Sequence, residues 1–379
     1  MIHVVRQGDS LYTIARQYGV PAADIASANE LPDPDVLVIG QALVIPQTPP
    51  ADRPEITVNG YAEWYTQTPP ASLIQEIRKR EGLLTYVMPA GYEVRRDGSL
   101  VLFDWGGIEE AAEAAGAATA IVVMNLEEGA FSQEIAEAIF ASEAAQDRLI
   151  GEINTLVREK GAKDVHMDFE YLGRENRDAY TAFLRKLKGQ LDEGVTLSVA
   201  LAPKTSADQP GVWYEGHDYG AIGGIADFVV VMTYEWGYSG GPPMAVSPIG
   251  PVRDVLEFAV SVIQPSKILM GQNLYGYDWT LPFEPGNPPA QGLSPQAALV
   301  RARDRNAAIQ YDETSQAPFF NYWRDGKEHV VWFEDARSIK AKFDLIKELG
   351  LMGISYWHLS FPFPQNWRLL DEMFHVKQL

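Results

Sequence analysis

The sequence predicts an α/β fold, a (β/α)8 TIM barrel preceded by a small βααβ domain. From Glu55 onward, a strand-like segment, a loop and a helix-like segment follow one another eight times, which favours a closed barrel over an open sheet. Strand-like segments such as 121–124 and 228–232 are continuously apolar, as is typical of parallel strands buried on both faces. The Pro-rich polar segment 47–54 predicts a semi-rigid linker between the domains 1–46 and 55–379.

Residues 1–46 hold the elements of the first domain. A short strand and a turn lead to a helix over 11–18, whose apolar residues share one face and which Asp9 or Ser10 is placed to cap. Pro21 ends this helix, a second helix follows at about 22–29, and a closing strand is expected over 41–46.

Residues 55–379 hold the elements of the barrel. The predicted strands are 56–64, 83–94, 118–125, 164–171, 196–202, 227–236, 268–277 and 353–359. The predicted helices are 72–81, 108–114, 132–160, 174–191, 252–262, 294–308, 336–349 and 367–374. Segment 310–333 interrupts the alternation, because Asp325-Gly326 separates two aromatic, β-rich runs; this pattern predicts an inserted β-hairpin.

Composition excludes several classes of function. The chain has 379 residues, 46% of them apolar and 22% charged, enough for one large globular core plus a small domain or for two ordinary domains. It has no cysteine, which excludes disulfides, zinc–thiolate sites and thiol nucleophiles. The net charge of −20 argues against nucleic acid and anionic lipid as partners. No apolar run reaches about 18 residues and the first residues lack a signal-peptide pattern, so we expect no transmembrane helix, and either a mature chain or export by another route.

The predicted fourth strand, 164–171, carries the chemistry. Its sequence Asp-Val-His-Met-Asp-Phe-Glu-Tyr alternates with period two, so Asp164, His166, Asp168 and Glu170 share one face. Four titratable groups on one face are unfavourable in an apolar core but suit the mouth of a barrel. Asp168 can raise the proton affinity of Glu170 and keep it an acid near neutral pH. The alternative is an ion-paired surface strand, since in a chain with 51 acidic residues Asp-x-Glu arises by chance about once or twice.

The expected carboxyl ends of the other strands are rich in aromatic, amide and carboxylate side chains. Such side chains build sugar sites, because pyranose rings present CH faces for stacking and hydroxyl groups for hydrogen bonds. Core packing is the alternative for about half of the aromatic residues. The candidate binding residues are Tyr92, Asn125, Glu235, Trp236, Asn273, Tyr275, Tyr277, Asp278, Trp279 and Trp357, beside Tyr234.

The first domain resembles the LysM carbohydrate-binding module. The resemblance lies in the opening Val-Val-Arg-Gln-Gly-Asp-Ser-Leu, in Ile14-Ala15, in Asn29 and in the closing Gly-Gln-Ala-Leu-Val-Ile-Pro at 40–46. It implies binding of N-acetylglucosamine-containing glycans, such as peptidoglycan or chitin. The alternative is that most of these residues only build the small core. The contacts that it implies are Gly8, Asp9, Ser10, Leu11, Thr13, Asn29 and Leu31.

The second domain resembles glycoside hydrolase family 18, especially its bacterial LysM-bearing branch of spore-cortex and cell-wall lytic enzymes. Residues 163–170 are similar to the fourth-strand signature Asp-Gly-x-Asp-x-Asp-x-Glu, and 232–245 and 275–282 are similar to segments of that branch. By this resemblance Glu170 matches the catalytic acid and Asp168 the assisting carboxylate. Tyr234 matches a catalytic tyrosine, and Trp357 the tryptophan that floors the substrate pocket.

This resemblance implies a retaining, substrate-assisted β-N-acetylglucosaminidase that hydrolyses peptidoglycan, in the spore cortex or its fragments. Glu170 protonates the glycosidic oxygen, and the 2-acetamido group of the substrate attacks the anomeric carbon. No metal and no organic cofactor is implied. The implied partner is peptidoglycan or another N-acetylglucosamine-containing glycan, with no nucleic acid and no membrane. The expected protein is a monomer located in the spore coat or cortex or at the cell wall.

Two departures from the signature are visible. Lys163 and Asp164 replace its Asp-Gly, and His166 stands where the wider family has Asp and the LysM-bearing branch has Asn. We hypothesise that His166 hydrogen-bonds Asp168 and makes its behaviour pH-dependent near neutrality. Three alternative functions are a chitinase or chito-oligosaccharide hydrolase, a non-catalytic glycan-binding protein on the same barrel, and a muramidase.

Overall fold

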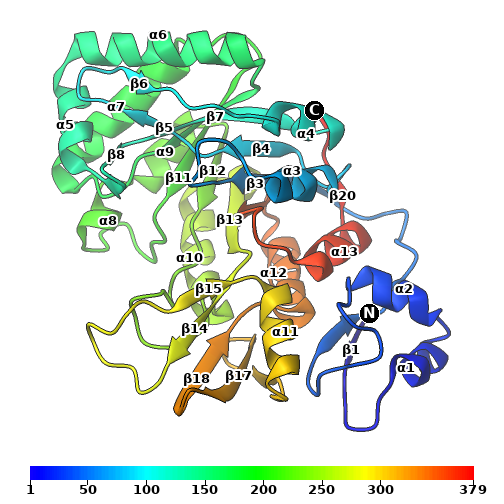
Figure 1. Cartoon of the computed structure of the whole chain (residues 1–379). Helices are drawn as coiled ribbons and strands as arrows, with labels where there is room; N and C mark the ends of the chain where they lie inside the picture. The colour runs from blue at the N-terminus through cyan, green and yellow to red at the C-terminus, as the bar shows by residue number, and fades with distance from the viewer.

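The computed structural model describes residues 1–379 (Figure 1). A small N-terminal domain, coloured blue, lies beside a barrel. A second, smaller sheet, coloured yellow to orange, projects from the barrel next to the N-terminal domain. No helix combines the length and the apolar composition needed to cross a membrane.

Eight parallel strands close into a ring, so the predicted (β/α)8 barrel is confirmed. Each strand pairs in parallel with the next, and the last pairs with the first. Their bounds are β3 (Glu55–Ala62), β4 (Tyr86–Pro89), β7 (Ala118–Met124), β10 (Asp164–Asp168), β11 (Thr196–Leu201), β12 (Phe228–Val231), β13 (Ile268–Asn273) and β19 (Gly353–Trp357).

Helices surround the ring and cover its outer face. Side chains between strands and helices form one apolar cluster of 67 buried residues, while a cluster of nine, including Tyr61 and Phe228, fills the barrel. The helices are α3 (Ala71–Arg78), α4 (Ile108–Ala114), α5 (Gln133–Ala141), α6 (Glu143–Lys160), α7 (Arg177–Lys188) with the 3₁₀ turn η1 (Arg174–Asn176), α8 (Val212–Glu215), α9 (Tyr219–Ile225), α10 (Ile249–Val262) followed by η2 (Pro265–Lys267), α12 (Ala336–Leu349) and α13 (Pro364–Met373).

Local chemistry explains where these elements begin and end. Helix α12 starts with a capping box between Asp335 and Ser338 and ends at Gly350, which has a φ of 64°. The predicted helix 132–160 is two helices, because Ser142 is extended and its hydroxyl caps α6. Helix α9 was not predicted, because its sequence Tyr-Gly-Ala-Ile-Gly-Gly-Ile has low helix propensity.

Several predicted strands are shorter than expected, and two of these differences shape the mouth of the barrel. Segment 83–94 breaks after β4 and resumes as β5 (Tyr92–Val94), which pairs with β7 and with β6 (Leu100–Val101). Segment 227–236 ends as a strand at Val231, so the residues that follow form a loop over the barrel mouth. A short hairpin, β8 (Leu126–Glu127) with β9 (Ala130–Phe131), follows β7 at the same end of the barrel.

The inserted subdomain is larger than the predicted hairpin at 310–333. It is a five-stranded antiparallel sheet in the order β15-β14-β18-β17-β16. The predicted strand 268–277 is in fact two strands, because the Asn273 side chain donates to the carbonyl oxygen of Tyr275 and turns the chain out of the barrel. The elements are β14 (Gly276–Thr280), β15 (Gln291–Leu293), α11 (Pro295–Asp304), β16 (Gln310–Asp312), β17 (Ala317–Arg324) and β18 (Lys327–Trp332).

The N-terminal domain has the predicted βααβ order and its own apolar cluster. Ser10, rather than Asp9, caps α1: its hydroxyl accepts from the backbone N–H of Thr13, and the Thr13 side chain accepts from the Ser10 N–H. The elements are β1 (Ile2–Val4), α1 (Leu11–Tyr18), α2 (Ala22–Ala28) and β2 (Ala42–Val44).

This domain is docked on α13 and α12 through buried hydrogen bonds. Gln365 donates to the Asn29 side chain at 3.0 Å and to the carbonyl oxygen of Ala42 at 2.6 Å. Arg337 donates to the carbonyl oxygen of Gly40 at 3.2 Å. A Cβ atom on Gly40 would lie 1.8 Å from the carbonyl oxygen of Ile309, so the approach requires glycine.

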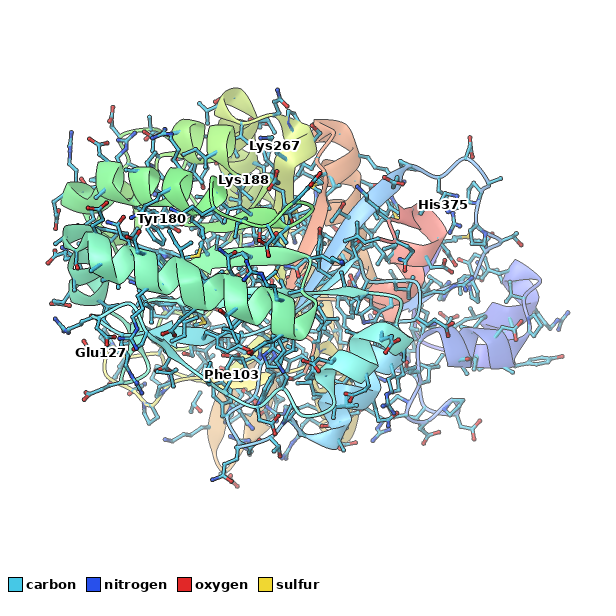
Figure 2. All side chains as sticks on the ribbon, turned by 90° about the horizontal axis from the view of Figure 1, so that it is seen from above. Phe103, Glu127, Tyr180, Lys188, Lys267 and His375 are labelled. Carbon is cyan, nitrogen blue, oxygen red and sulfur yellow. The ribbon has the colours of Figure 1, made fainter.

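The linker also lies against the barrel. The last strand, β20 (His375–Val376), pairs with β3, and the His375 N–H donates to the carbonyl oxygen of Pro54 at 2.9 Å. Nη2 of Arg53 lies 3.2 Å from Nδ1 of His375, which Figure 2 labels at this junction. The carboxyl terminus therefore fastens the linker to the barrel.

Candidate active site

Strand β10 places its titratable side chains inside the barrel. Asp164, His166 and Asp168 are buried there, while Val165 and Met167 belong to the apolar cluster under the helices. Glu170 lies two residues after the end of the strand, and its side chain is also buried. It lies at the carboxyl-terminal mouth of the barrel, where the active sites of barrel enzymes are found. The alternation ends at Tyr171, which has a φ of 55° and is 44% exposed.

Asp168 and Glu170 form an electrostatically coupled pair. Burial and the charge of Asp168 raise the pKa of Glu170 well above its ordinary value. Burial and the charge of Glu63 raise the pKa of Asp168 to about 7. Because two neighbouring buried carboxylates resist simultaneous ionisation, the pair retains a proton near neutral pH. A carboxyl group that retains its proton at this pH is a suitable general acid.

Glu170 is held by two residues from neighbouring loops. The Asn125 side chain accepts from the Glu170 N–H and donates to its carbonyl oxygen, both at 2.9 Å. The indole N–H of Trp213 donates to Oε2 of Glu170. Asn125 is fully buried, so it positions the backbone of Glu170 and does not line a sugar site as predicted.

His166 does not bond Asp168, which corrects the hypothesis drawn from the sequence. Its Nε2 lies 2.6 Å from the hydroxyl of Tyr61, and its Nδ1 lies 2.7 Å from Oγ of Ser198. Ser198 in turn donates to Asp164 at 2.5 Å, so a hydrogen-bonded chain runs along the barrel interior. Burial lowers the pKa of His166 to about 3, and the ring is therefore neutral near pH 7.

Tyr234 lies beside the carboxyl pair. Burial and the charges of Asp168 and Glu170 keep the pKa of Tyr234 well above its ordinary value, so its hydroxyl remains a hydrogen-bond donor. Its ring packs over Gly271, where a Cβ atom would lie 2.9 Å away. Trp357 packs on Tyr61 with ring centroids 5.1 Å apart.

A further carboxylate, Glu235, lies on the side of the inserted sheet. It accepts hydrogen bonds from the hydroxyl groups of Tyr275 and Tyr277, the latter at 3.0 Å. Together with Trp213, Tyr234 and Trp236 it lines a groove of about 530 Å³. The mouth of the barrel thus combines carboxyl groups, phenols and indoles, which can stack on a sugar ring and bond its hydroxyl groups.

Comparison with known proteins identifies the family. Residues 57–361 match the model for glycosyl hydrolases family 18, and residues 3–46 match the model for the LysM domain. The chain belongs to glycoside hydrolase family 18. Both resemblances drawn from the sequence are therefore confirmed, and the protein is a glycoside hydrolase with a LysM domain.

Relatives match this family 18 enzyme along its whole length. The cortical fragment-lytic enzyme of Bacillus subtilis (strain 168) is 45% identical, over 99% of this chain and 98% of the relative. The crystal structure of the spore cortex-lytic enzyme SleL of Bacillus megaterium QM B1551 has a TM-score of 0.95 and 44% identity, over 100% of this chain and 99% of that chain. A chitinase of Chromobacterium violaceum ATCC 12472 shares the fold, with a TM-score of 0.74 and 24% identity over 84% of this chain and 98% of that chain.

Three further predicted binding residues of this family 18 enzyme are structural. Tyr92 is 1% exposed and packs against Phe103 with ring centroids 4.7 Å apart. The strand is interrupted between β4 and β5, so the Tyr92 side chain points away from the site that strand alternation predicted. Asn273 is fully buried and forms the turn that ends β13. Trp279 is 2% exposed, and its indole N–H donates to the carbonyl oxygen of Gly241 at 2.9 Å.

Asp278 also leaves the predicted site. Successive residues of β14 face opposite sides of the inserted sheet, so Tyr277 faces Glu235 while Asp278 faces α11. There its carboxylate accepts from Arg301, from Tyr322 and, at 2.9 Å, from Nδ1 of His329. It is 4% exposed and stabilises the inserted subdomain.

Tyr61, Glu63 and Trp213 were missed by sequence reasoning. Tyr61 and Glu63 belong to the first barrel strand and the loop after it, and Glu63 Oε2 lies 3.3 Å from Nε2 of His358. Both residues lie within the predicted strand 56–64. Because they are two residues apart, strand alternation would have placed them on the same face. Trp213 lies on the short helix α8 within an irregular loop, where no periodic pattern marks it.

In the LysM domain, two of the predicted glycan contacts are buried. Asn29 is 1% exposed, and its side chain bonds the backbone of Ile25 and Val44 as well as Gln365. Leu11 belongs to the apolar cluster. Gly8, Ser10 and Thr13 are exposed, and Asp9 and Leu31 are half-buried.

Proposed function

We propose that this enzyme is a retaining β-N-acetylglucosaminidase that hydrolyses peptidoglycan of the spore cortex or its fragments. The observation that carries the proposal is the buried Asp168–Glu170 pair beside Tyr234, in which burial and the charge of Asp168 raise the pKa of Glu170 well above its ordinary value. The names of the two full-length relatives, a cortical fragment-lytic and a spore cortex-lytic enzyme, support the choice of substrate.

Glu170 acts first as the general acid in this mechanism. Its proton passes to the glycosidic oxygen, and the bond between that oxygen and the anomeric carbon breaks. The 2-acetamido oxygen of the substrate forms the new bond to the anomeric carbon and gives a cyclic oxazolinium ion. Water then attacks the same carbon and transfers a proton to the Glu170 carboxylate, while the bond from the acetamido oxygen to that carbon breaks. The product has the original anomeric configuration.

Asp168 and Tyr234 hold the acetamido group. The Tyr234 hydroxyl donates to its carbonyl oxygen, and Asp168 accepts from its N–H and balances the positive charge of the oxazolinium ion. Oδ1 of Asp168 has no hydrogen-bond partner in the protein, so it is available to a ligand N–H. Trp357 forms the floor of the pocket. This scheme requires N-acetylglucosamine on the non-leaving side of the cut.

The LysM domain binds a second stretch of the glycan through its exposed turn, with Gly8, Asp9, Ser10, Thr13 and Leu31. Asn29 and Leu11 support this surface from the core. We infer that the protein acts as a monomer on this polymer in the spore coat or cortex or at the cell wall, with neither nucleic acid nor membrane as a partner.

Product analysis on purified cortex fragments tests the proposal. Wild type and Glu170→Gln are incubated with muropeptides, the products are reduced, and mass spectrometry identifies the reduced end sugar. New N-acetylglucosamine ends that are absent with Glu170→Gln are expected. New muramic acid ends indicate a muramidase, faster cleavage of chitin oligomers indicates a chitinase, and binding without cleavage of either substrate indicates a glycan-binding protein. Each of these three outcomes contradicts the proposal.

A further inference from the structure

Trp213 makes the one side-chain hydrogen bond that reaches the Glu170 carboxyl group. Its indole N–H donates to Oε2, while no protein group donates to Oε1. We propose that Trp213 is the positioning residue of Glu170: it fixes one carboxyl oxygen, directs the other toward the glycosidic oxygen, and stabilises the negative charge between the two steps. The inference rests on the proposed function of Glu170 as acid and base.

The Trp213 ring is held in place by other aromatic rings. The Tyr171 ring lies nearly parallel to it, with centroids 5.9 Å apart and planes 13° apart. Phe131 of β9 packs on Tyr171 at 6.4 Å, and Tyr214 packs on Trp213 at 5.3 Å. Because neighbours restrain the indole, its N–H direction is set before a substrate arrives, and less conformational entropy is lost when Glu170 is oriented.

The loop that carries Trp213 is fastened to the segment that carries Glu170. Nε2 of His217 lies 2.9 Å from the carbonyl oxygen of Phe169, and Nζ of Lys204 donates to the carbonyl oxygen of His217 at 3.0 Å. A Cβ atom on Gly216 would lie 2.5 Å from Cβ of Leu172, so the two backbones are in close contact. The segment that carries Trp213 is therefore bonded to, and packed directly against, the segment that carries Glu170.

This arrangement suits a carboxyl group that has to work in both protonation states. Glu170 donates its proton in the first step and accepts one in the second. Asp168 and burial favour the protonated form, whereas an indole N–H can only donate and favours the ionised form. Trp213 therefore limits the bias toward the acid form and makes the base form accessible for the second step.

Trp213→Phe is the variant that isolates the hydrogen bond, since it keeps an aromatic ring against Tyr171 and removes the N–H. Tyr214→Phe is the matched control, because it removes a polar group from the neighbouring ring. The kcat and kcat/KM of both variants are measured against pH on the cortex fragments, with thermal unfolding as the test of folding.

We expect Trp213→Phe to lower kcat by about tenfold to a hundredfold, the effect of one hydrogen bond to a charged group. Losing the donor raises the pKa of Glu170. Activity that requires the protonated acid then persists to higher pH, so the basic limb of kcat/KM moves to higher pH. For Tyr214→Phe, we expect the basic limb of kcat/KM at the same pH as in wild type. A kcat and a basic limb of Trp213→Phe equal to those of wild type would overturn the inference.

A measurement that needs no turnover separates this inference from the proposed function. The infrared band of the Glu170 carboxyl group is identified by its loss in Glu170→Gln and is titrated in wild type and Trp213→Phe. A titration at higher pH in Trp213→Phe supports the inference even if cortex fragments are not cleaved. Identical titrations contradict it even if wild type is active.

Discussion

The hydroxyl of Tyr61 lies 2.6 Å from Nε2 of His166, and Oγ of Ser198 lies 2.7 Å from the other ring nitrogen. Both nitrogens are therefore occupied by groups without charge, in a position that water does not reach. Because burial lowers the pKa of His166 to about 3, the ring is a fixed neutral element that supports Tyr61 under Trp357. It does not sense pH near neutrality.

We predict that His166→Asn leaves both limbs of the activity–pH profile between pH 5 and 8 where they are in wild type. The free energy of unfolding falls by about 1–3 kcal/mol, because Tyr61 or Ser198 loses a buried partner. Activity profiles and urea unfolding at several pH values check this. A limb that moves by a full pH unit would restore a titrating role for His166.

The pH dependence of stability has a definite sign for this residue. The folded-state pKa of about 3 lies below the ordinary value of 6.5, so the unfolded chain binds the proton more readily. The contribution of His166 to stability is present above pH 6.5 and is lost as the pH falls from 6.5 toward 3. His166→Asn is therefore expected to reduce the decline of stability over this window.

Asp168→Asn is predicted to move the basic limb of kcat/KM to lower pH. Burial and the Asp168 charge both raise the pKa of Glu170, and the amide removes the second cause. The proton on Glu170 is then lost at a lower pH, and kcat falls by about a hundredfold to a thousandfold, because the oxazolinium ion loses a charged partner. The pH profile of the residual activity checks the shift. A limb that stays in place or moves to higher pH would contradict the coupling.

Much of the barrel was accessible from the sequence because its signal is periodic. Each of the eight predicted strands overlaps a strand of the ring, and alternation along 164–170 placed Asp168 and Glu170 on the inner face. The incorrect predictions concern positions that are determined by single hydrogen bonds, which leave no periodic pattern in the sequence. Asn273 ends β13 and sends the chain into a second sheet, which moves Asp278 away from the cleft.

Residues that act through the backbone were also misassigned. Asn125 and Asn29 are polar residues at expected binding positions, yet both side chains form hydrogen bonds with backbone groups of neighbouring segments. Sequence patterns do not distinguish an amide that bonds a sugar from one that bonds a loop, because both tasks use the same donors and acceptors. Trp213 was missed for the opposite reason, since its irregular loop offers no pattern at all.

Asp278 is predicted to be essential for the inserted subdomain and not for sugar contact. Its carboxylate is the shared acceptor of Arg301, Tyr322 and His329. Asp278→Ala leaves the partly exposed guanidinium of Arg301 and the buried side chains of Tyr322 and His329 without their shared acceptor, which costs about 3 kcal/mol. Guanidinium unfolding and limited proteolysis between 276 and 332 measure the effect. Glu284→Ala, at an exposed position in the loop before β15, is the control and is expected to change the stability by less than about 0.5 kcal/mol.

Gly40→Ala is predicted to release the LysM domain from the barrel. Gly40 has a φ of 82°, and an added Cβ atom would lie 1.8 Å from the carbonyl oxygen of Ile309, so the backbones have to separate. The hydrogen bond from Arg337 to Gly40 and those from Gln365 to Asn29 and Ala42 weaken with that movement. Faster proteolysis of the linker at 47–54 and a larger radius in small-angle X-ray scattering report the release.

Gly19→Ala is the matched control for this prediction. Gly19 has a φ of 67° at the end of α1, and no atom lies within 4 Å of its added Cβ. Its substitution strains the LysM domain by about 1 kcal/mol but leaves the interface intact. Linker proteolysis is therefore expected to rise with Gly40→Ala alone. Equal proteolysis of the two variants would show that backbone strain, and not the contact with Ile309, is the cause.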